Sequence, residues 1–197
     1  MKKQVKRLFD ERNGILSTAE LKEANLCYEA IQRLLIEGEI ERIRRGYYQR
    51  VSEHSFSDIP TLSRLFSDAV ICLESALDYY GYTDRTPSGW HLAVPFKSAR
   101  ARFSIDYPIV KPHFIRESKY PIGIETVLID GTEILIYNRE RTICDLLLHK
   151  NKIDAEVFNT AIQRYVRDPA KMETRLLQYA KALRVERKAR EIVGTWL

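Results

Sequence analysis

The chain has 197 residues, 45% of them hydrophobic and 30% charged, with a net charge of +5. This balance is too apolar for a disordered chain, and the length suits one domain or two small ones. No apolar run approaches the length of about 18 residues that is needed to cross a bilayer. The basic start Met1–Arg7 leads into no apolar signal segment. We therefore expect a cytoplasmic protein with no membrane partner.

The charge is unevenly distributed along the chain. Residues 1–50 carry a net charge of +3, residues 51–160 a net charge of −3, and residues 161–197 a net charge of +5. Basic ends favour a polyanion such as nucleic acid, because neutralised phosphates release condensed counterions. Ordinary solvated surface charge would give the same totals, so the charge alone does not establish nucleic-acid binding and the sequence motifs are needed.

The cysteines and histidines give no metal or redox motif. No two cysteines lie two to four residues apart, as a zinc site or a redox motif requires, so we expect three reduced core residues. The histidines are equally scattered, and we predict no metal site and no cofactor. These residues are Cys27, Cys72, Cys144, His54, His91, His113 and His149.

Two helix signals precede residue 21. Apolar residues at positions 5, 8 and 9 have the spacing of a short amphipathic helix that ends at Asn13-Gly14. The segment Ser17–Glu20 has the spacing of a capping box, in which a serine hydroxyl and a glutamate carboxylate each accept a backbone hydrogen bond. A second helix should therefore start near Thr18.

This second helix and the next one form a helix-turn-helix pattern. We expect the second helix to bury Ala19 and Leu21 and to end at Ala24-Asn25, because asparagine tolerates the left-handed conformation. A third helix is predicted from about Cys27 to Glu37, followed by Gly38. Two helices joined by a tight turn are typical of DNA-binding domains when the second has a polar outward face. The inner stripe comprises Cys27, Ile31, Leu34 and Leu35, and the outward face comprises Tyr28, Glu29, Gln32 and Arg33.

A basic hairpin is predicted directly after the third helix. Glu39–Ile43 and Tyr47–Arg50 are short strand-like runs, and Gly46 supplies the positive φ that the turn needs. The clustered arginines repel one another unless an anion approaches, and a projecting hairpin reaches phosphates or a narrow minor groove. A solvated turn is the alternative. Three helices and a basic wing predict a winged helix-turn-helix, with Thr18, Tyr28, Gln32, Arg33, Arg42, Arg44, Arg45, Tyr47 and Tyr48 as DNA-binding residues.

These segments resemble the N-terminal winged helix of AbiEi-type antitoxins. The similar residues are 14–21 (GILSTAEL) and 33–48 (RLLIEGEIERIRRGYY), with Asn25 where many members have glycine. The resemblance implies a double-stranded DNA operator and repression of the protein's own operon. It also implies a nucleotidyltransferase-like toxin as partner, in a type IV toxin–antitoxin system of abortive infection.

The remainder of the chain is predicted to form an α+β domain with a helical C-terminus. The polar segment His54–Pro60 is expected to be a linker, so that residues 1–57 bind DNA and residues 58–197 form the second domain. A helical period runs from Leu62 to Gly81, and the chain is expected to be helical beyond Asn138, with breaks near Asn151 and Asp168-Pro169. The predicted strands are Trp90–Pro95, Ile109–Ile115, and the hairpin of Glu125–Ile129 and Glu133–Tyr137 around Asp130-Gly131.

The second domain resembles the same family. The similar residues are 72–77 (CLESAL) with Gly81, 91–95 (HLAVP) and 139–145 (RERTICD), in the family's order. With the winged helix, the resemblance spans about residues 14–165. It implies that residues 58–197 form the antitoxin and partner-binding domain.

Several side chains of the second domain raise the question of catalysis. The chain has no nucleophile elbow and no phosphate-binding glycine loop, so we predict that it is not an enzyme. Glu74 and Ser75 are expected to cap or orient the helix that follows them. Arg141 and Asp145, four residues apart on a helix, are expected to form an ion pair. The groups considered are Glu74, Ser75, His91, Asp106, Glu125, Asp130 and Asp145.

The sequence therefore favours a DNA-binding transcriptional regulator that acts as an antitoxin. Two alternatives stay open. One is a stand-alone winged-helix regulator whose second domain senses a ligand or dimerises. The other is a defence nuclease that the winged helix guides to DNA.

Overall fold

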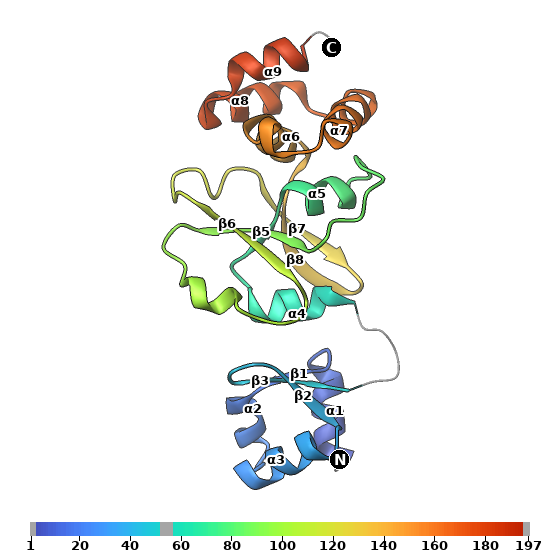
Figure 1. Cartoon of the computed structure of the whole chain (residues 1–197), viewed down its shortest axis with the longest axis vertical. Coiled ribbons are helices and arrows are strands. Elements are labelled where there is room, and N and C mark those ends of the chain that lie inside the picture. The colour runs from blue at the N-terminus through green and yellow to red at the C-terminus, as the bar shows by residue number, and fades with distance from the viewer. Residues whose placement is uncertain (1–2, 52–56, 195–197) are drawn as a thin grey trace. The chain divides into compact units, whose positions relative to one another are not determined.

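The computed structural model describes residues 3–51 and 57–194 and has an α+β fold with a helical C-terminus, as the sequence predicts (Figure 1). The chain divides into two compact units. The first is Met1–Phe66 with Ser104–Pro108, and the second is Ser67–Phe103 with Ile109–Leu197. The predicted boundary between residues 57 and 58 stays a prediction. No helix in the described ranges is long and apolar enough to span a membrane.

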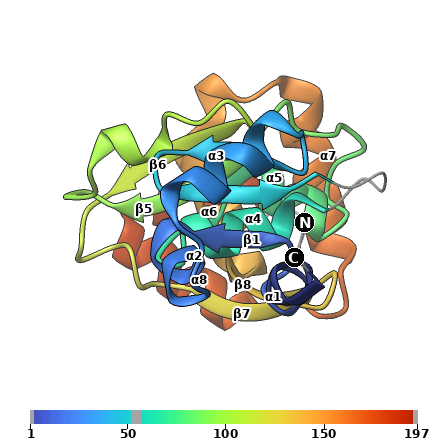
Figure 2. The same ribbon diagram turned by 90° about the horizontal axis from the view of Figure 1, so that it is seen from below.

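The N-terminal unit has the element order of a winged helix. Three antiparallel strands form a sheet in the order β1-β3-β2, and three helices pack against it (Figures 1 and 2). The helix α4 (Asp58–Leu65) belongs to the same unit. The winged-helix elements are α1 (Lys3–Glu11), β1 (Ile15–Ser17), α2 (Thr18–Glu23), α3 (Tyr28–Ile36), β2 (Ile40–Arg44) and β3 (Tyr47–Arg50).

Local sequence signals set the ends of these elements. Asn13, at φ 53°, and Gly14 turn the chain after α1. Ser17 and Glu20 form the predicted capping box at the start of α2. Asn25, at φ 60°, takes the left-handed conformation between α2 and α3, so the position tolerates asparagine in place of glycine. These three predictions are confirmed.

The core of the winged helix differs from the prediction at two positions. Leu21, Ile31 and Leu34 are buried as expected, together with Phe9 and Ile40. Ala19 is exposed because it lies on the outer side of the short helix α2. Cys27 is also exposed, since it occupies the N-cap position of α3, one turn before Ile31, the first buried residue of the helix. The prediction of a buried Cys27 is wrong, whereas Cys72 and Cys144 are buried.

The predicted linker and the helical period after it are partly wrong. His54–Phe56 lie outside the described residues, but Asp58–Pro60 begin α4, and the Ser57 hydroxyl accepts the Ile59 amide proton. Proline is compatible with the first turn of a helix, where its missing N–H is not needed. The expected helix from Leu62 to Gly81 is interrupted by the strand β4 (Val70–Ile71) and resumes as α5 (Leu73–Tyr79).

The second unit contains a five-stranded mixed sheet in the order β6-β5-β4-β8-β7. The pairs β5–β6 and β4–β8 are parallel, and the pairs β4–β5 and β7–β8 are antiparallel. Asp130, at φ 49°, and Gly131, at φ 75°, form the predicted two-residue hairpin turn. The strands are β5 (Trp90–Pro95), β6 (Val110–Ile115), β7 (Ile124–Ile129) and β8 (Thr132–Tyr137).

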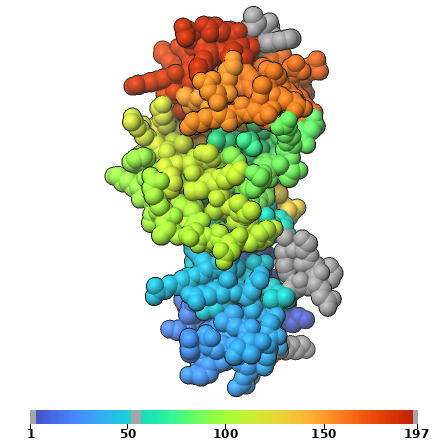
Figure 3. All heavy atoms as spheres, viewed as in Figure 1, coloured from blue at the N-terminus to red at the C-terminus, as the bar shows by residue number. Residues whose placement is uncertain are grey.

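Four C-terminal helices complete this unit. They share a core with α5 and are drawn together in Figure 1, and the orange and red atoms of this part of the chain adjoin one another in Figure 3. The predicted breaks near Asn151 and Asp168-Pro169 are confirmed, and a further break occurs at Arg184, at φ 65°. The helices are α6 (Arg139–Leu148), α7 (Ala155–Arg167), α8 (Glu173–Leu183) and α9 (Glu186–Ile192).

Candidate nucleic-acid interface

The helix α3 presents a polar face outward, as a recognition helix must. Tyr28 is 69% exposed, Arg33 is exposed, and Gln32 is half-buried. Ile31 and Leu34 fix this orientation by packing into the core of the winged helix. The face therefore offers one phenol, one amide and one guanidinium to a partner.

The same face also carries a negative charge. Glu29 is exposed, and the pKa of its carboxyl is lowered by a hydrogen bond from its own backbone amide and one from the Cys27 side chain. It is therefore ionised at neutral pH. A carboxylate on a DNA-facing helix disfavours close phosphates and can accept a hydrogen bond from the cytosine amino group.

The hairpin β2–β3 forms the predicted basic wing. Gly46, at φ 85°, makes its turn, and the Gly46 carbonyl accepts a hydrogen bond from the Thr18 amide at 2.8 Å. The structure thus brings Thr18, at the start of α2, next to the wing. The Arg44 guanidinium lies 4.4 Å from the centre of the Tyr47 ring, in cation–π geometry.

One of the predicted residues points away from the surface. Tyr48 is only 8% exposed and packs into the core of the winged helix. Neighbouring residues of a strand face opposite sides, so Tyr47 and Tyr48 cannot both lie outside. This alternation was the signal in the sequence that could have separated them.

The arginines of the winged helix divide into two groups. Arg7, Arg12 and Arg50 lie near the carboxylates of Glu11, Glu20 and Asp10, respectively. Within the described part of the chain, the side chains of Arg33, Arg42 and Arg45 are exposed and have no carboxylate partner. In the winged helix, the charges of Arg33 on α3 and of Arg42 and Arg45 on the wing are therefore available to an external anion.

Glu20 organises the base of the helix-turn-helix. Its carboxylate accepts the Ser17 amide at 2.8 Å and is also paired with Arg64 of α4. Burial acts to raise the pKa of Glu20, but the hydrogen bonds from Arg64 and Ser17 outweigh it and lower the pKa to about 2. This glutamate is thus a structural residue, and the sequence could not show its pairing with Arg64, 44 positions away.

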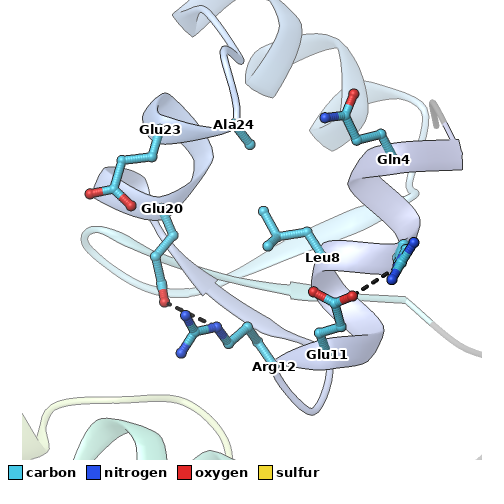
Figure 4. Close-up of a pocket in the computed structure, with 8 residues that line it drawn as sticks. Gln4, Leu8, Glu11, Arg12, Glu20, Glu23 and Ala24 are labelled. Atoms are coloured by element: carbon cyan, nitrogen blue, oxygen red, sulfur yellow. Dashed lines mark hydrogen bonds and ion pairs between the residues drawn. The ribbon is translucent and has the colours of Figure 1, made fainter.

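A hollow of about 430 Å³ lies between α1 and α2 (Figure 4). Three glutamates and two arginines line it, and none of the predicted DNA-binding residues does. Its mixed charge does not suit a phosphate. The lining residues are Gln4, Arg7, Leu8, Glu11, Arg12, Glu20, Glu23 and Ala24.

Three of the scattered histidines meet in the second unit. The rings of His91 and His113 are stacked, with His91 Nδ1 3.1 Å from His113 Nε2, and the His149 ring centre lies 6.5 Å from that of His113. Burial, with the Lys111 charge, lowers the pKa of His91 to about 4, and burial with the neighbouring histidines lowers that of His113 to about 4. No three His, Cys, Asp or Glu side chains in residues 3–51 and 57–194 are arranged to hold a metal ion.

The serine–histidine pair does not have the geometry of a nucleophile and its base. The Ser75 hydroxyl accepts the backbone amide proton of His91 at 2.9 Å, so it fastens α5 to β5. Ser75 was expected to cap or to orient the helix. It does not cap α5, whose N-cap is Cys72 with no side-chain capping bond, but it orients α5 through its hydrogen bond with the His91 amide on β5. Both serine and histidine therefore have structural contacts here.

The Arg141–Asp145 ion pair is confirmed, and it is buried. Arg141 Nε donates to Asp145 at 3.0 Å, with the two side chains 1% and 8% exposed. Arg141 also donates to the carbonyls of Lys119 and Ile122, both at 2.7 Å. The pair links α6 to the segment before β7.

The order of the helices and strands defines the N-terminal unit as a winged helix, with exposed arginines on α3 and on the wing. Residues 3–51 match the family model described as "Transcriptional regulator, AbiEi antitoxin". The resemblance seen in the sequence is thereby confirmed for the winged helix, and it supports a DNA-binding antitoxin in broad terms. No curated protein matches the chain.

A solved structure supports the fold along nearly the whole chain. The crystal structure of the RV2827C protein from Mycobacterium tuberculosis is similar to this chain with a TM-score of 0.69 and 17% sequence identity. The similarity covers 98% of this chain and 75% of the other. At this sequence identity, the similarity shows a shared fold and nothing about function.

Proposed function

We propose that this protein is a transcriptional regulator that binds operator DNA through its winged helix and represses its own operon. The observation that carries the proposal is the division of the arginines. Those on α1, at the α1–β1 turn and on β3 lie near carboxylates, whereas Arg33, Arg42 and Arg45 on α3 and the wing have no acidic partner among the described residues. Exposed cations without partners are suited to phosphates, which bind arginine in bidentate geometry.

The two parts of the surface have different tasks in this proposal. The wing, with Arg42, Arg44 and Arg45, contacts phosphates and supplies affinity without sequence preference. The face of α3 enters the major groove, where Gln32 suits adenine and Arg33 suits guanine. The hydrogen bond from the Thr18 amide to the Gly46 carbonyl keeps the wing next to the start of α2.

We assign the neutralisation of the toxin to the second unit. By the family resemblance, it counteracts a nucleotidyltransferase-like toxin, and it does so by binding rather than by catalysis. Two features support a non-catalytic role: the Ser75 hydroxyl is bonded to a backbone amide, and the Arg141–Asp145 pair is enclosed.

A reporter assay tests the regulator. The DNA upstream of the protein's own coding sequence drives the reporter, and the full chain is supplied from a second plasmid. Repression is expected, and Arg33→Ala combined with Arg45→Ala should relieve it. Lys6→Ala combined with Arg7→Ala is the matched control, because it removes the same charge from the exposed side of α1. Equal repression by both double variants would refute the assignment of the DNA-binding face.

Co-expression with a nucleotidyltransferase-like protein encoded beside this chain tests the antitoxin. The full chain should restore growth, and the Arg33→Ala, Arg45→Ala variant should restore it equally well while failing to repress. If the full chain represses but does not protect, the protein is a stand-alone regulator.

A further inference from the structure

The face of α3 contains an apolar side chain that the core does not use. Ile36, the last residue of α3, is 85% exposed, and Tyr28 is 69% exposed. Residues 28, 32 and 36 are four apart and so lie along one side of the helix. Gln32, the half-buried amide, therefore stands between two exposed side chains with large apolar surfaces.

The position of Ile36 is not explained by packing within the winged helix. Leu34 is 8% exposed, and Leu35 is partly buried against the same core, while Ile36 points away from both. A single exposed isoleucine is ordinary on a protein surface. This one lies on the same helix as the exposed and unpaired Arg33, on the face that the proposed function places in the major groove.

We infer that Ile36 contacts the C5-methyl group of a thymine and so sets part of the operator preference. This inference rests on the proposed function. The thymine methyl is the apolar group that base pairs present in the major groove, and it distinguishes thymine from cytosine. One helical turn separates Ile36 from Gln32, about 6 Å along the helix. Base pairs are about 3.4 Å apart, so the thymine lies within about two base pairs of the base that Gln32 contacts.

The test uses DNA that differs by this methyl group alone. A duplex is first selected from a random library with the full chain, and each thymine is then replaced by uracil, one position at a time. Binding is measured by fluorescence anisotropy. Burial of one methyl group corresponds to about a fourfold change in affinity, so one uracil should weaken binding of the natural chain by about that factor.

The protein variants identify which side chain senses the methyl. Ile36→Ala should bind the thymine duplex about as weakly as the natural chain binds the uracil duplex, and it should no longer distinguish the two. Ile36→Val retains methyl groups near the helix and should restore part of the discrimination. Leu128→Ala on β7, which is 68% exposed in the other unit, is the control and should behave like the natural chain.

The outcomes separate this inference from the proposed function. If the chain binds DNA but no uracil matters, or if Ile36→Ala keeps the full thymine preference, the inference is overturned and the regulator stands. If Ile36→Ala changes self-association in sedimentation and leaves base preference intact, Ile36 belongs to a contact between copies, and the inference is again overturned. If the full chain selects no duplex from the library, the proposed function fails with it.

Discussion

Arg33, Arg42 and Arg45 of the winged helix and Arg141 of the second unit have opposite surroundings. In the winged helix, Arg33, Arg42 and Arg45 are exposed and lack carboxylate partners in the described chain, so their charge is available to an external anion. In the second unit, Arg141 is 1% exposed and is bonded to a carboxylate and two carbonyls. Exposure and pairing, rather than residue type, separate a binding arginine from a structural one. Substitution of Arg33, Arg42 or Arg45 should therefore affect DNA binding, and substitution of Arg141 should affect stability.

The largest effect is expected from the buried arginine. Arg141→Met leaves Asp145 buried without its counter-charge, which should lower the free energy of unfolding by about 3–5 kcal/mol. Urea denaturation of the full chain, followed by circular dichroism, measures this loss. Replacing both partners, as Arg141→Met with Asp145→Leu, should recover much of it, because a buried ion pair can be exchanged for apolar packing. A loss below about 1 kcal/mol in the single variant would show that the pair is dispensable.

The close packing around Arg141 gives the second prediction. A Cβ atom on Gly123, at φ 79°, would lie 2.5 Å from the Cβ of Arg141. Gly131, at φ 75°, has no heavy atom within 4 Å of such a Cβ and is the matched control. Gly131→Ala should cost about 1–2 kcal/mol for the left-handed backbone alone. Gly123→Ala should cost at least about 1 kcal/mol more in the same urea titration, because the Cβ of Arg141 is fixed to the α6 backbone and a backbone segment must shift; equal losses would contradict the tight fit.

The stacked histidines predict a dependence of stability on pH. The pKa values of His91 and His113 are lowered to about 4 from 6.5, so the folded protein binds fewer protons than the unfolded chain between these values. The contribution of these two histidines to the free energy of unfolding should therefore be fully present above about pH 6.5 and decline as the pH falls towards about 4. The urea midpoint of the natural chain should fall between pH 7 and pH 5. His113→Gln should show a smaller fall over the same interval, and an identical fall would assign the effect to other groups.

The sequence was sufficient to predict local structure that depends on residues close together in the chain. The capping box of Ser17 and Glu20, the left-handed Asn25, the Gly46 turn and the Asp130-Gly131 hairpin all depend on residues within a few positions. Each has a strong local signal, and each was predicted.

The sequence was insufficient where short segments depend on distant ones. The strand β4 has two residues and exists because it pairs with β5 and β8, and the three-residue β1 pairs with β3. Such strands are too short for a period to be visible. The meeting of His91, His113 and His149 likewise depends on the pairing of β5 with β6 and on the end of α6.

At the candidate site, the sequence predicted which residue types gather but not how far each is exposed. The wing and the outward face of α3 were predicted as a pair of elements. The burial of Tyr48 and the exposure of Cys27 and Ile36 became visible only with the packing of the core. Each turn of α3 has both buried and exposed residues. At the two ends of so short a helix, a period of 3.6 residues does not decide which side a residue faces.

The salt dependence of DNA binding shows whether the wing contacts phosphates. Anisotropy titrations of the full chain at several salt concentrations give the slope of log K against log salt, which is negative and whose magnitude grows by about 0.9 for each phosphate contact. Arg44→Ala with Arg45→Ala should weaken binding to every duplex and reduce the slope by up to about 1.8, two contacts' worth. Lys6→Ala with Arg7→Ala, which removes the same charge from α1, should leave the slope close to that of the natural chain. If the two double variants reduce the slope equally, general charge rather than the wing attracts DNA, and the wing is not the phosphate-binding surface.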